Sequence, residues 1–245
     1  HQFSIEYIIK LYITHLLKIT REFLNIQETY NLRAVITVPV LFTNIQRSML
    51  KSIFELCNIN VIRIINEPTA AILPYVINNN ESTTANQIEN ILVIDCGGGT
   101  TDFTVMECDH SDTFFEVKYT TGDNFLGGED ITDTIYNYVI SKYAHIDGIY
   151  QKIRKQCEKA KCLLSYQQNA TIYIEDGQDI KEGQHKVCIS RSQFINMNNN
   201  FFKKIRNCIL DIKHIDRGVD RVVLVGGTTR IPYFSQLCKD IFGND

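Results

Sequence analysis

Three glycines between two aspartates form the stretch whose residue types point most directly to chemistry. Asp95 and Asp102 belong to two apolar runs, each long enough to be a buried strand, and the turn between the runs includes Gly97, Gly98, Gly99 and Thr100. Glycines let backbone N–H groups approach a bulky anion, and carboxylates beside phosphates suit Mg²⁺, which prefers oxygen ligands and keeps several waters. The stretch predicts a β-hairpin that holds a nucleotide's phosphates and metal; a tight hairpin with a flexible tip is the alternative.

Other segments carry glycine or glutamate where a predicted strand ends. Glu67 follows the strand predicted over 61–65, at the sheet edge where open α/β sheets bind ligands. The pair 127–128 precedes a helix, whose N-terminus admits a phosphate, although a plain capped glycine turn fits the spacing equally well. The pair 226–227 follows the last predicted strand, with Arg230 close by. Several such ends converging on one crevice favour a nucleotide site.

A predicted helix over 149–165 carries two stripes. One is apolar and predicts a buried face. The other follows the spacing i, i+3, i+4, i+7 and consists of Glu158, Lys161, Cys162 and Ser165. Because such a stripe is usually a solvated face, the pattern alone leaves its role open.

Alternating strands and helices must position these residues. An amphipathic helix is predicted over 4–24, with a packing stripe at Ile5, Ile8, Tyr12, Leu16, Ile19 and Phe23. A strand at 34–39, a helix and a strand at 61–65 then predict a parallel pair with a crossover helix. Pro68 suits the first turn of a helix to about Tyr75, and the polar residues 78–90 predict a loop or linker.

The second half continues this alternation. After the glycine hairpin come a strand at 114–121 and a small hairpin at 169–174 and 185–189, with a charged turn at 175–183. Ser190 and Gln193 form a capping box that predicts the start of one long helix with a buried stripe from Phe194 to Ile212. A strand at 221–225 and a helix between Pro232 and Gly243 complete the pattern.

Composition excludes several classes of partner. Twenty-five Lys and Arg against 28 Asp and Glu give a net charge of −3 without a long basic block, which predicts no nucleic-acid partner. No apolar run has the length of a membrane span, which predicts no membrane partner. Eight scattered cysteines without a C-x-x-C pair indicate reduced thiols and a reducing compartment, so a cytoplasmic location is predicted.

Six stretches give the chain a family resemblance. In chain order they are Ala34–Pro39, Ile64–Ala71, Asp95–Asp102, Gly127–Asp130, Cys157–Lys161 and Val223–Pro232. Together they resemble the nucleotide-binding domain of the seventy-kilodalton heat-shock chaperones, within the actin/hexokinase-like ATPase superfamily. The implied fold class is α/β, an actin-like ATPase (ribonuclease H-like) fold. Residues 1–80 would be part of the first lobe and 81–245 a nearly complete second lobe, in which 130–218 include a small α+β subdomain.

The resemblance also implies cofactors and residue roles. ATP or ADP would bind with Mg²⁺, which Asp95 and Asp102 would hold through water, and Glu67 and Thr100 would complete the catalytic set for phosphoryl transfer to water. Nucleotide contacts would come from Gly97, Gly98, Gly99, Thr100, Gly128, Glu158, Lys161, Ser165, Gly226, Gly227, Thr228 and Arg230. Pro39 and Arg47 would relay the nucleotide state towards a substrate-binding domain.

Several positions depart from the family pattern. The chain begins after the family's first phosphate loop and catalytic lysine, so it is expected to hydrolyse ATP negligibly by itself. Cys162 stands where the family has an arginine that stacks on adenine, so a cation–π contact is absent. Cys96 and Thr101 replace an apolar and an aromatic residue in the phosphate hairpin.

Two functional classes follow from the resemblance. The first is an ATP-driven chaperone, whose partners would be client polypeptides, bound through a substrate domain outside this chain, J-domain co-chaperones and nucleotide-exchange factors. The second is a non-hydrolysing relative that acts as a co-chaperone or exchange factor. The intact stretches around Glu67 and Asp95 favour the first class, whereas Cys162 favours the second. A sugar kinase is disfavoured because no segment resembles a sugar-binding insertion.

Overall fold

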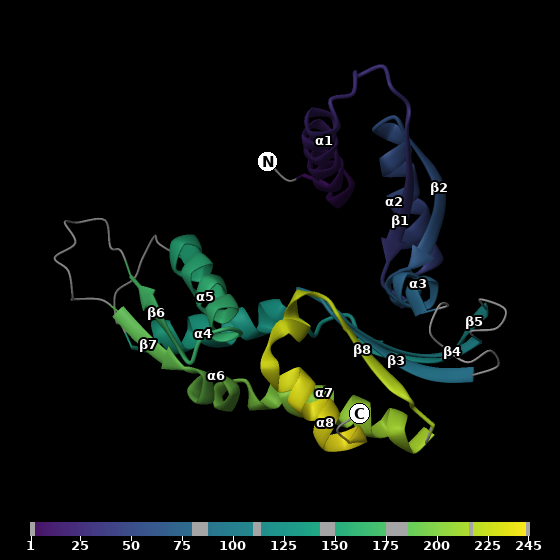
Figure 1. Ribbon diagram of the computed structural model, residues 1–245. Helices are drawn as coiled ribbons and strands as arrows, with labels where there is room; N and C mark the ends of the chain where they lie inside the picture. The colour runs from purple at the N-terminus through teal and green to yellow at the C-terminus, as the bar shows by residue number, and fades with distance from the viewer. Residues whose placement is uncertain are drawn as a thin grey trace. The chain divides into compact units, whose positions relative to one another are not determined.

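The computed structural model of the protein describes residues 3–79, 88–109, 114–142, 150–174, 186–215 and 218–243. It divides into two compact units, His1–Pro74 and Tyr75–Asp245. Figure 1 labels the helices and strands of both units.

The first unit is a parallel strand pair with helices packed on it. In order it contains α1 (Ile5–Leu24), β1 (Leu32–Val38), α2 (Asn44–Leu56), β2 (Ile59–Asn66) and the start of α3 (Glu67–Asn79). β1 pairs with β2 in parallel, which confirms the predicted strand–helix–strand unit, and α2 is the crossover helix. Thr43 and Gln46 form a capping box at the start of α2. The predicted topology of this segment, a parallel strand pair joined by a crossover helix, is therefore correct.

The predicted packing face of α1 is wrong. Its six residues are exposed, whereas Ile13 is buried and packs with Ile9 and Leu17 against α2 and β2. The helix carries apolar side chains on more than one face, so two stripes competed in the sequence. The stripe at i, i+4, i+8 is the one that meets the core.

The connection predicted over 78–90 is shorter than expected at both ends, because α3 runs to Asn79 and β3 (Ile88–Cys96) begins at Ile88. Residues 80–87 lie outside the described part. The polar start of β3 is compatible with a strand because its groups find partners. The Nε of Arg221 donates to Glu89 Oε1 at 2.7 Å, and the Asn90 N–H donates to Asp220 Oδ2 at 2.8 Å.

A four-stranded sheet organises the second unit. β3 forms antiparallel pairs with β4 (Thr101–Asp109), which pairs in turn with β5 (Phe114–Asp123), while β8 (Arg221–Val225) lies parallel to β3, so the order is β5-β4-β3-β8. Four successive residues of β3, 91–94, are fully buried, and because successive side chains alternate between faces, both faces of the sheet are covered there.

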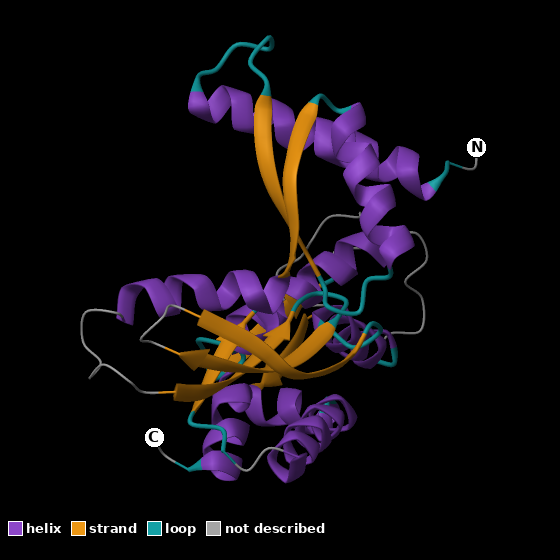
Figure 2. Ribbon diagram, turned by 90° about the vertical axis from the view of Figure 1, so that its right-hand side faces the viewer, coloured by secondary structure: helices purple, strands orange, loops and turns teal. Residues whose placement is uncertain are grey.

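Helices and a small hairpin complete this unit (Figures 1 and 2). They are α4 (Gly128–Ile140), α5 (Tyr150–Leu164), β6 (Asn169–Tyr173), β7 (Lys186–Ser190), α6 (Arg191–Met197), α7 (Asn199–Ile215), the 3₁₀ helix η1 (Gly227–Arg230) and α8 (Pro232–Phe242). One core cluster joins residues of β3, β4 and all these helices except η1. The hairpin β6–β7 is confirmed, and its predicted turn lies outside the described residues.

The single long helix predicted after Ser190 is two helices. The capping box of Ser190 and Gln193 is present, but α6 ends at Met197 and α7 starts at Asn199. Between them the buried Asn198 donates from Nδ2 to Phe194 O at 2.9 Å. A short amide side chain that bonds to the backbone competes with helix continuation, which explains the break. The buried stripe predicted from the apolar spacing continues across it.

Candidate nucleotide-binding site

The two aspartates of the glycine hairpin lie side by side. In the register of β3 and β4, Asp95 is directly opposite Asp102, so both side chains project from the same face of the sheet. Asp102 is 2% exposed, and burial raises the pKa of the Asp95 carboxyl above its ordinary value. Like charges directly opposite each other are destabilising, so the arrangement favours a cation between them.

Two glycines leave room for these carboxylates. Gly226 has a positive φ of 85°, and a Cβ there would overlap the Cys96 carbonyl and lie 2.8 Å from Asp95 Oδ1. On the other side, a Cβ at Gly122 would lie 2.7 Å from Asp102 Oδ1. Gly122 was not predicted as a site residue; its position in the strand that follows the glycine hairpin is the sequence signal that points to it.

The tip of the hairpin is open, because Gly98 and Gly99 are exposed and a Cβ at either would meet no atom within 4 Å. The Gly97 N–H donates to Thr100 O at 3.0 Å, which closes the turn. An open, glycine-lined turn leaves space for a bulky anion against the backbone.

The first turn of α4 docks on this hairpin. The Gly128 N–H donates to Gly97 O at 3.0 Å, and the Glu129 N–H donates to Gly98 O at 2.7 Å. Gly127 must lack a side chain, because a Cβ there would overlap the Gly98 carbonyl. These N–H groups of the helix N-terminus therefore bond to carbonyl groups of the glycine turn, and Gly128 stabilises the turn through its backbone.

Lys161 ties α5 to the same place. It is 7% exposed, and its Nζ donates to Gly128 O at 2.9 Å and Thr132 Oγ1 at 3.1 Å and pairs with Glu158 Oε2 at 2.5 Å. An ammonium has three N–H groups, so these partners account for all of them. Part of the predicted polar stripe is thus a buried link between α4 and α5. Thr132, which was not predicted as a site residue, also donates to Glu158 Oε2 at 2.6 Å.

Burial tends to raise the pKa of Glu158, but hydrogen bonds from Lys161 and Thr132 outweigh it and leave the pKa below its ordinary value. The neighbouring Cys162 thiol donates to Glu158 Oε1 at 3.6 Å. Burial and that carboxylate raise the pKa of Cys162. The thiol is therefore protonated and uncharged beside an ionised carboxylate at neutral pH.

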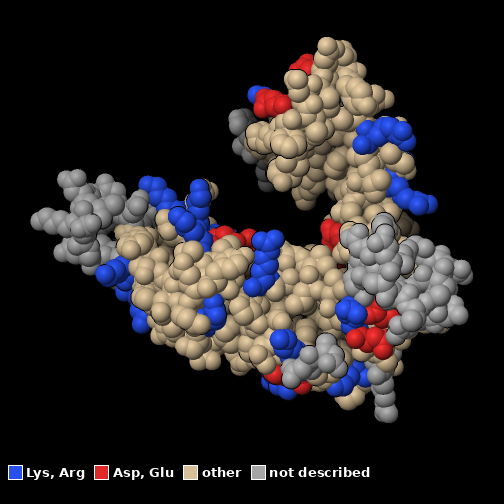
Figure 3. All heavy atoms as spheres, viewed as in Figure 1, with Lys and Arg blue, Asp and Glu red and all other residues tan. Residues whose placement is uncertain are grey.

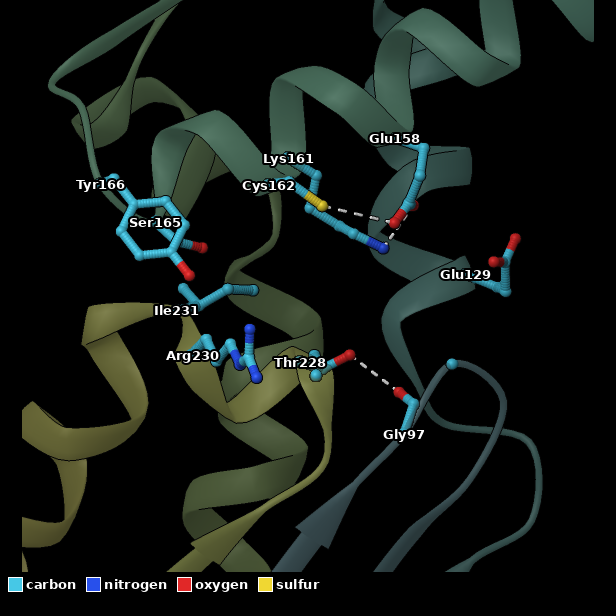
Figure 4. A pocket seen from close by; sticks show the side chains of 12 residues that line it. Gly97, Glu129, Glu158, Lys161, Cys162, Ser165, Tyr166, Thr228, Arg230 and Ile231 are labelled. Carbon is cyan, nitrogen blue, oxygen red and sulfur yellow. Dashed lines mark hydrogen bonds and ion pairs between the residues drawn. The ribbon is translucent and has the colours of Figure 1, made fainter. Parts of the chain in front are cut away.

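A pocket of about 350 Å³ lies among these elements (Figure 4). Predicted residues from three distant segments line it, namely Gly97, Gly98, Glu158, Lys161, Cys162, Ser165, Gly227, Thr228 and Arg230. Thr228 Oγ1 donates to Gly97 O at 2.8 Å and so joins the start of η1 to the hairpin. Glu129, Tyr166 and Ile231 also line the pocket and were not predicted, although Tyr166 and Ile231 each directly follow a predicted residue.

Other predicted site residues lie beside the pocket or in the first unit. Gly99, Thr100 and the two aspartates belong to the hairpin end next to it. In the first unit, the Nη2 of Arg47 donates to Pro39 O at 3.3 Å, so the two predicted relay residues are in contact. Glu67 starts α3 directly after β2, as expected from the sequence. These three are described within their own unit, so their roles stay predictions.

The two carboxylates of the hairpin suit Mg²⁺ better than they suit a metal ion that only protein side chains coordinate. Among the described residues, no group of three or more His, Cys, Asp or Glu side chains is arranged to hold an ion. Mg²⁺ is commonly bound by one or two carboxylates together with waters and substrate phosphates. The Asp95–Asp102 pair beside an open glycine turn fits that requirement.

Comparison with known proteins decides the family. A family model described as "Hsp70 protein" matches residues 1–245. The chain belongs to the Hsp70 family. It is 36% identical over 225 residues to the mitochondrial heat shock 70 kDa proteins of Solanum tuberosum and Pisum sativum, and each match covers 86% of this chain. The chain spans about a third of the length of these relatives, since each match covers 32% of theirs.

The Hsp70 match confirms the predicted resemblance and the α/β, actin-like ATPase fold of an Hsp70 nucleotide-binding domain. In the described ranges, the helices of this Hsp70 chain are too short or too polar to cross a membrane. All eight cysteines lie in described residues and are free thiols, in agreement with the scattered spacing in the sequence.

Proposed function

We propose that the chain binds ATP and ADP with Mg²⁺ and is the nucleotide-binding part of an ATP-driven chaperone. The observation that carries the proposal is the pocket in which the glycine hairpin, α5 and the turn after β8 converge. Its two sides differ in chemistry: α5 and η1 supply side chains, whereas the hairpin supplies the backbone of Gly97 and Gly98, with the paired carboxylates of Asp95 and Asp102 next to the pocket. That asymmetry suits a nucleotide, which has a base and sugar at one end and phosphates with a metal at the other.

The proposed roles follow the two ends. Glu158, Ser165, Arg230 and the turn 226–228 border the adenosine, and Lys161 holds Glu158 in place through the ion pair described above. Gly97, Gly98, Gly99 and Thr100 receive the phosphates. Asp95 and Asp102 hold Mg²⁺ through its waters, and the bound ion would neutralise charge on the phosphates. Glu67, at the start of α3, stays a predicted catalytic residue.

Client polypeptides, J-domain co-chaperones and exchange factors are the partners proposed for the whole protein. Because the named relatives are themselves heat shock 70 kDa proteins, the co-chaperone alternative is not favoured. Cys162 does not close the pocket; it is an exposed residue of its lining. On the face drawn in Figure 3, Lys and Arg form separate groups, and the absence of a nucleic-acid partner stays a prediction from the sequence.

The proposed location is a reducing compartment. The relatives do not support a specifically cytoplasmic location, since both carry the word "mitochondrial" in their names. Free thiols agree with either compartment, because reduced cysteines are the rule inside cells.

Calorimetric titration of MgATP and MgADP into the chain tests the proposal. We expect saturable binding that Asp95→Asn weakens at least about tenfold, because the variant removes one of two magnesium-facing charges. Asp211→Asn, an equal charge change on the exposed side of α7, is the matched control and should leave binding unchanged. Absence of binding to the wild-type chain, or equal affinities for wild type and Asp95→Asn, would contradict the proposal.

A further inference from the structure

Arg154 of α5 forms ion pairs with two carboxylates of α4. Its Nη1 lies 2.5 Å from Glu129 Oε2, and its Nη2 lies 2.8 Å from Asp133 Oδ1. The arginine side chain is 26% exposed, whereas both carboxylates are 52% exposed. A planar guanidinium that engages two groups at once fixes their geometry more tightly than a flexible ammonium does. Arg154 therefore pairs the Glu129 carboxylate with a cation that also binds Asp133.

Glu129 connects this ion pair to the nucleotide site. Its N–H donates to Gly98 O, and the residue lines the same pocket as Gly97 and Gly98. In Figure 4 its carboxylate points away from Gly97. A carboxylate at this position repels an anion on the glycine loop unless a cation neutralises it, because Coulomb interactions extend over several ångströms at a partly exposed site.

The two cationic side chains that line the pocket, Lys161 and Arg230, are not paired with Glu129 in this way. Lys161 is committed to Gly128, Thr132 and Glu158, as described above. Arg230 lies on the wall formed by η1. Hydrogen bonding to Glu129 raises the pKa of the Arg154 guanidinium, so it remains charged beside the carboxylate. Arg154 is thus the cation seated directly on Glu129.

We propose that Arg154 is a positioning residue for the phosphate end of the nucleotide: it neutralises Glu129 and holds its carboxylate away from the glycine loop. The inference rests on the nucleotide binding proposed above. Arg154 does not line the pocket, so it acts through Glu129 and not by touching the nucleotide. Its effect must then depend on the ligand's charge, which separates it from a purely structural role.

The test compares a charged and an uncharged ligand. MgATP and adenosine are titrated calorimetrically into the wild-type chain, Arg154→Leu, and Arg154→Leu combined with Glu129→Gln. We expect Arg154→Leu to bind MgATP about three- to tenfold more weakly and adenosine within about twofold of wild type, since adenosine carries no phosphate charge. The added Glu129→Gln should restore MgATP affinity to within about twofold of wild type, because it removes the charge that Arg154 neutralises.

Two further variants keep the test independent of folding defects. Lys159→Leu removes an equal charge from the exposed side of α5 and should change neither affinity. Glu129→Gln alone keeps the Arg154–Asp133 pair and should tighten MgATP binding while leaving adenosine unaffected. Melting temperatures of all variants show which of them fold. If Arg154→Leu does not fold, the MgATP and adenosine affinities of Glu129→Gln provide the test.

The outcomes separate this inference from the proposed function. Equal losses of MgATP and adenosine affinity in Arg154→Leu, or no rescue by Glu129→Gln, would overturn the inference and leave nucleotide binding intact. Failure of the wild-type chain to bind either ligand would overturn both.

Discussion

At the residue scale, the site depends on glycines that are required for different reasons. Gly98 and Gly99 keep the hairpin tip open, whereas Gly226 and Gly122 let the backbone approach two carboxylates closely. The sequence shows the glycines but not which atoms approach them, because those atoms come from distant segments. The neighbours Gly226 and Gly227 illustrate this, since only the first has a positive φ and a crowded Cβ position.

Gly226→Ala is expected to destabilise the protein by about 2–4 kcal/mol, from positive-φ strain and from overlap with Cys96 and Asp95. Gly227→Ala is the matched control, because a Cβ there meets no atom within 4 Å, and it should stay within about 0.5 kcal/mol of wild type. Urea denaturation measures both. Similar stabilities for the two variants would show that the close approach at Gly226 is not needed.

Glu158 gives the protein a pH dependence with a defined sign. Burial tends to raise its pKa, and the hydrogen bonds from Lys161 and Thr132 bring the net pKa below the ordinary value. A carboxyl with a lowered pKa in the folded state adds stability above its unfolded pKa of about 4.3, and that stability is lost as the pH falls through the folded pKa. Glu158→Gln should therefore lower stability at pH 7 and lose less stability on acidification than wild type. Urea midpoints measured from neutral to acidic pH check this, and parallel curves for the two proteins would contradict it.

At the element scale, periodicity predicted most helices and strands and the buried face of α5, but not the buried face of α1 or the break between α6 and α7. The parallel β1–β2 pair, the β3–β4 hairpin and the β6–β7 hairpin follow directly from their apolar patterns. The face of α1 was misassigned because two apolar stripes compete on one helix, and packing against α2 chooses between them. The break at Asn198 depends on a side-chain bond to Phe194 O, which the pattern of apolar residues does not encode.

The sequence likewise predicted most residues of the site but not the contacts between them. The polar stripe of α5, the hairpin glycines and the turn 226–230 were found as separate patterns, and the pocket joins most of them. That Lys161 is a buried link and not a solvated side chain required the positions of Gly128 and Thr132 in three dimensions.

Lys161→Met should loosen the contact between α4 and α5. It leaves Glu158 without its cation and Gly128 O without this donor, so we expect a loss of about 1.5–3 kcal/mol, typical of hydrogen bonds to charged groups. The Gly128 and Glu129 amides, which bond to the hairpin carbonyls, should exchange hydrogen faster than in wild type. Lys159→Met on the exposed side of α5 is the control. Unchanged exchange at both amides would show that α4 is held on the hairpin without Lys161.

At the scale of the whole molecule, α1 carries the largest group of exposed apolar side chains on any one helix in the part that the structure describes. Nine large apolar residues of this helix are exposed, and Ile13 is its buried residue. Exposed apolar stripes of this size mark interaction surfaces or promote self-association. With a net charge of only −3, this stripe should govern the solution behaviour of the chain more than charge repulsion does.

We therefore expect the chain to self-associate in a concentration-dependent manner through α1. Combining Ile8→Glu and Ile19→Glu should shift sedimentation towards the monomer, because like charges on the stripe repel and the apolar contact is lost. Both residues are about half exposed, at 55% and 48%, so the variant should remain folded with a stability within about 1 kcal/mol of wild type. Ile13→Glu is the control for position on the helix. It places a charge in the core formed with Ile53 and Ile59 and should unfold the first unit. A folded double variant beside an unfolded Ile13→Glu would show that the position of the charge, and not charge alone, decides whether the unit folds. If wild type and the double variant sediment alike at every concentration, the stripe does not drive association, and the exposed face of α1 has no part in the behaviour of this chain in solution.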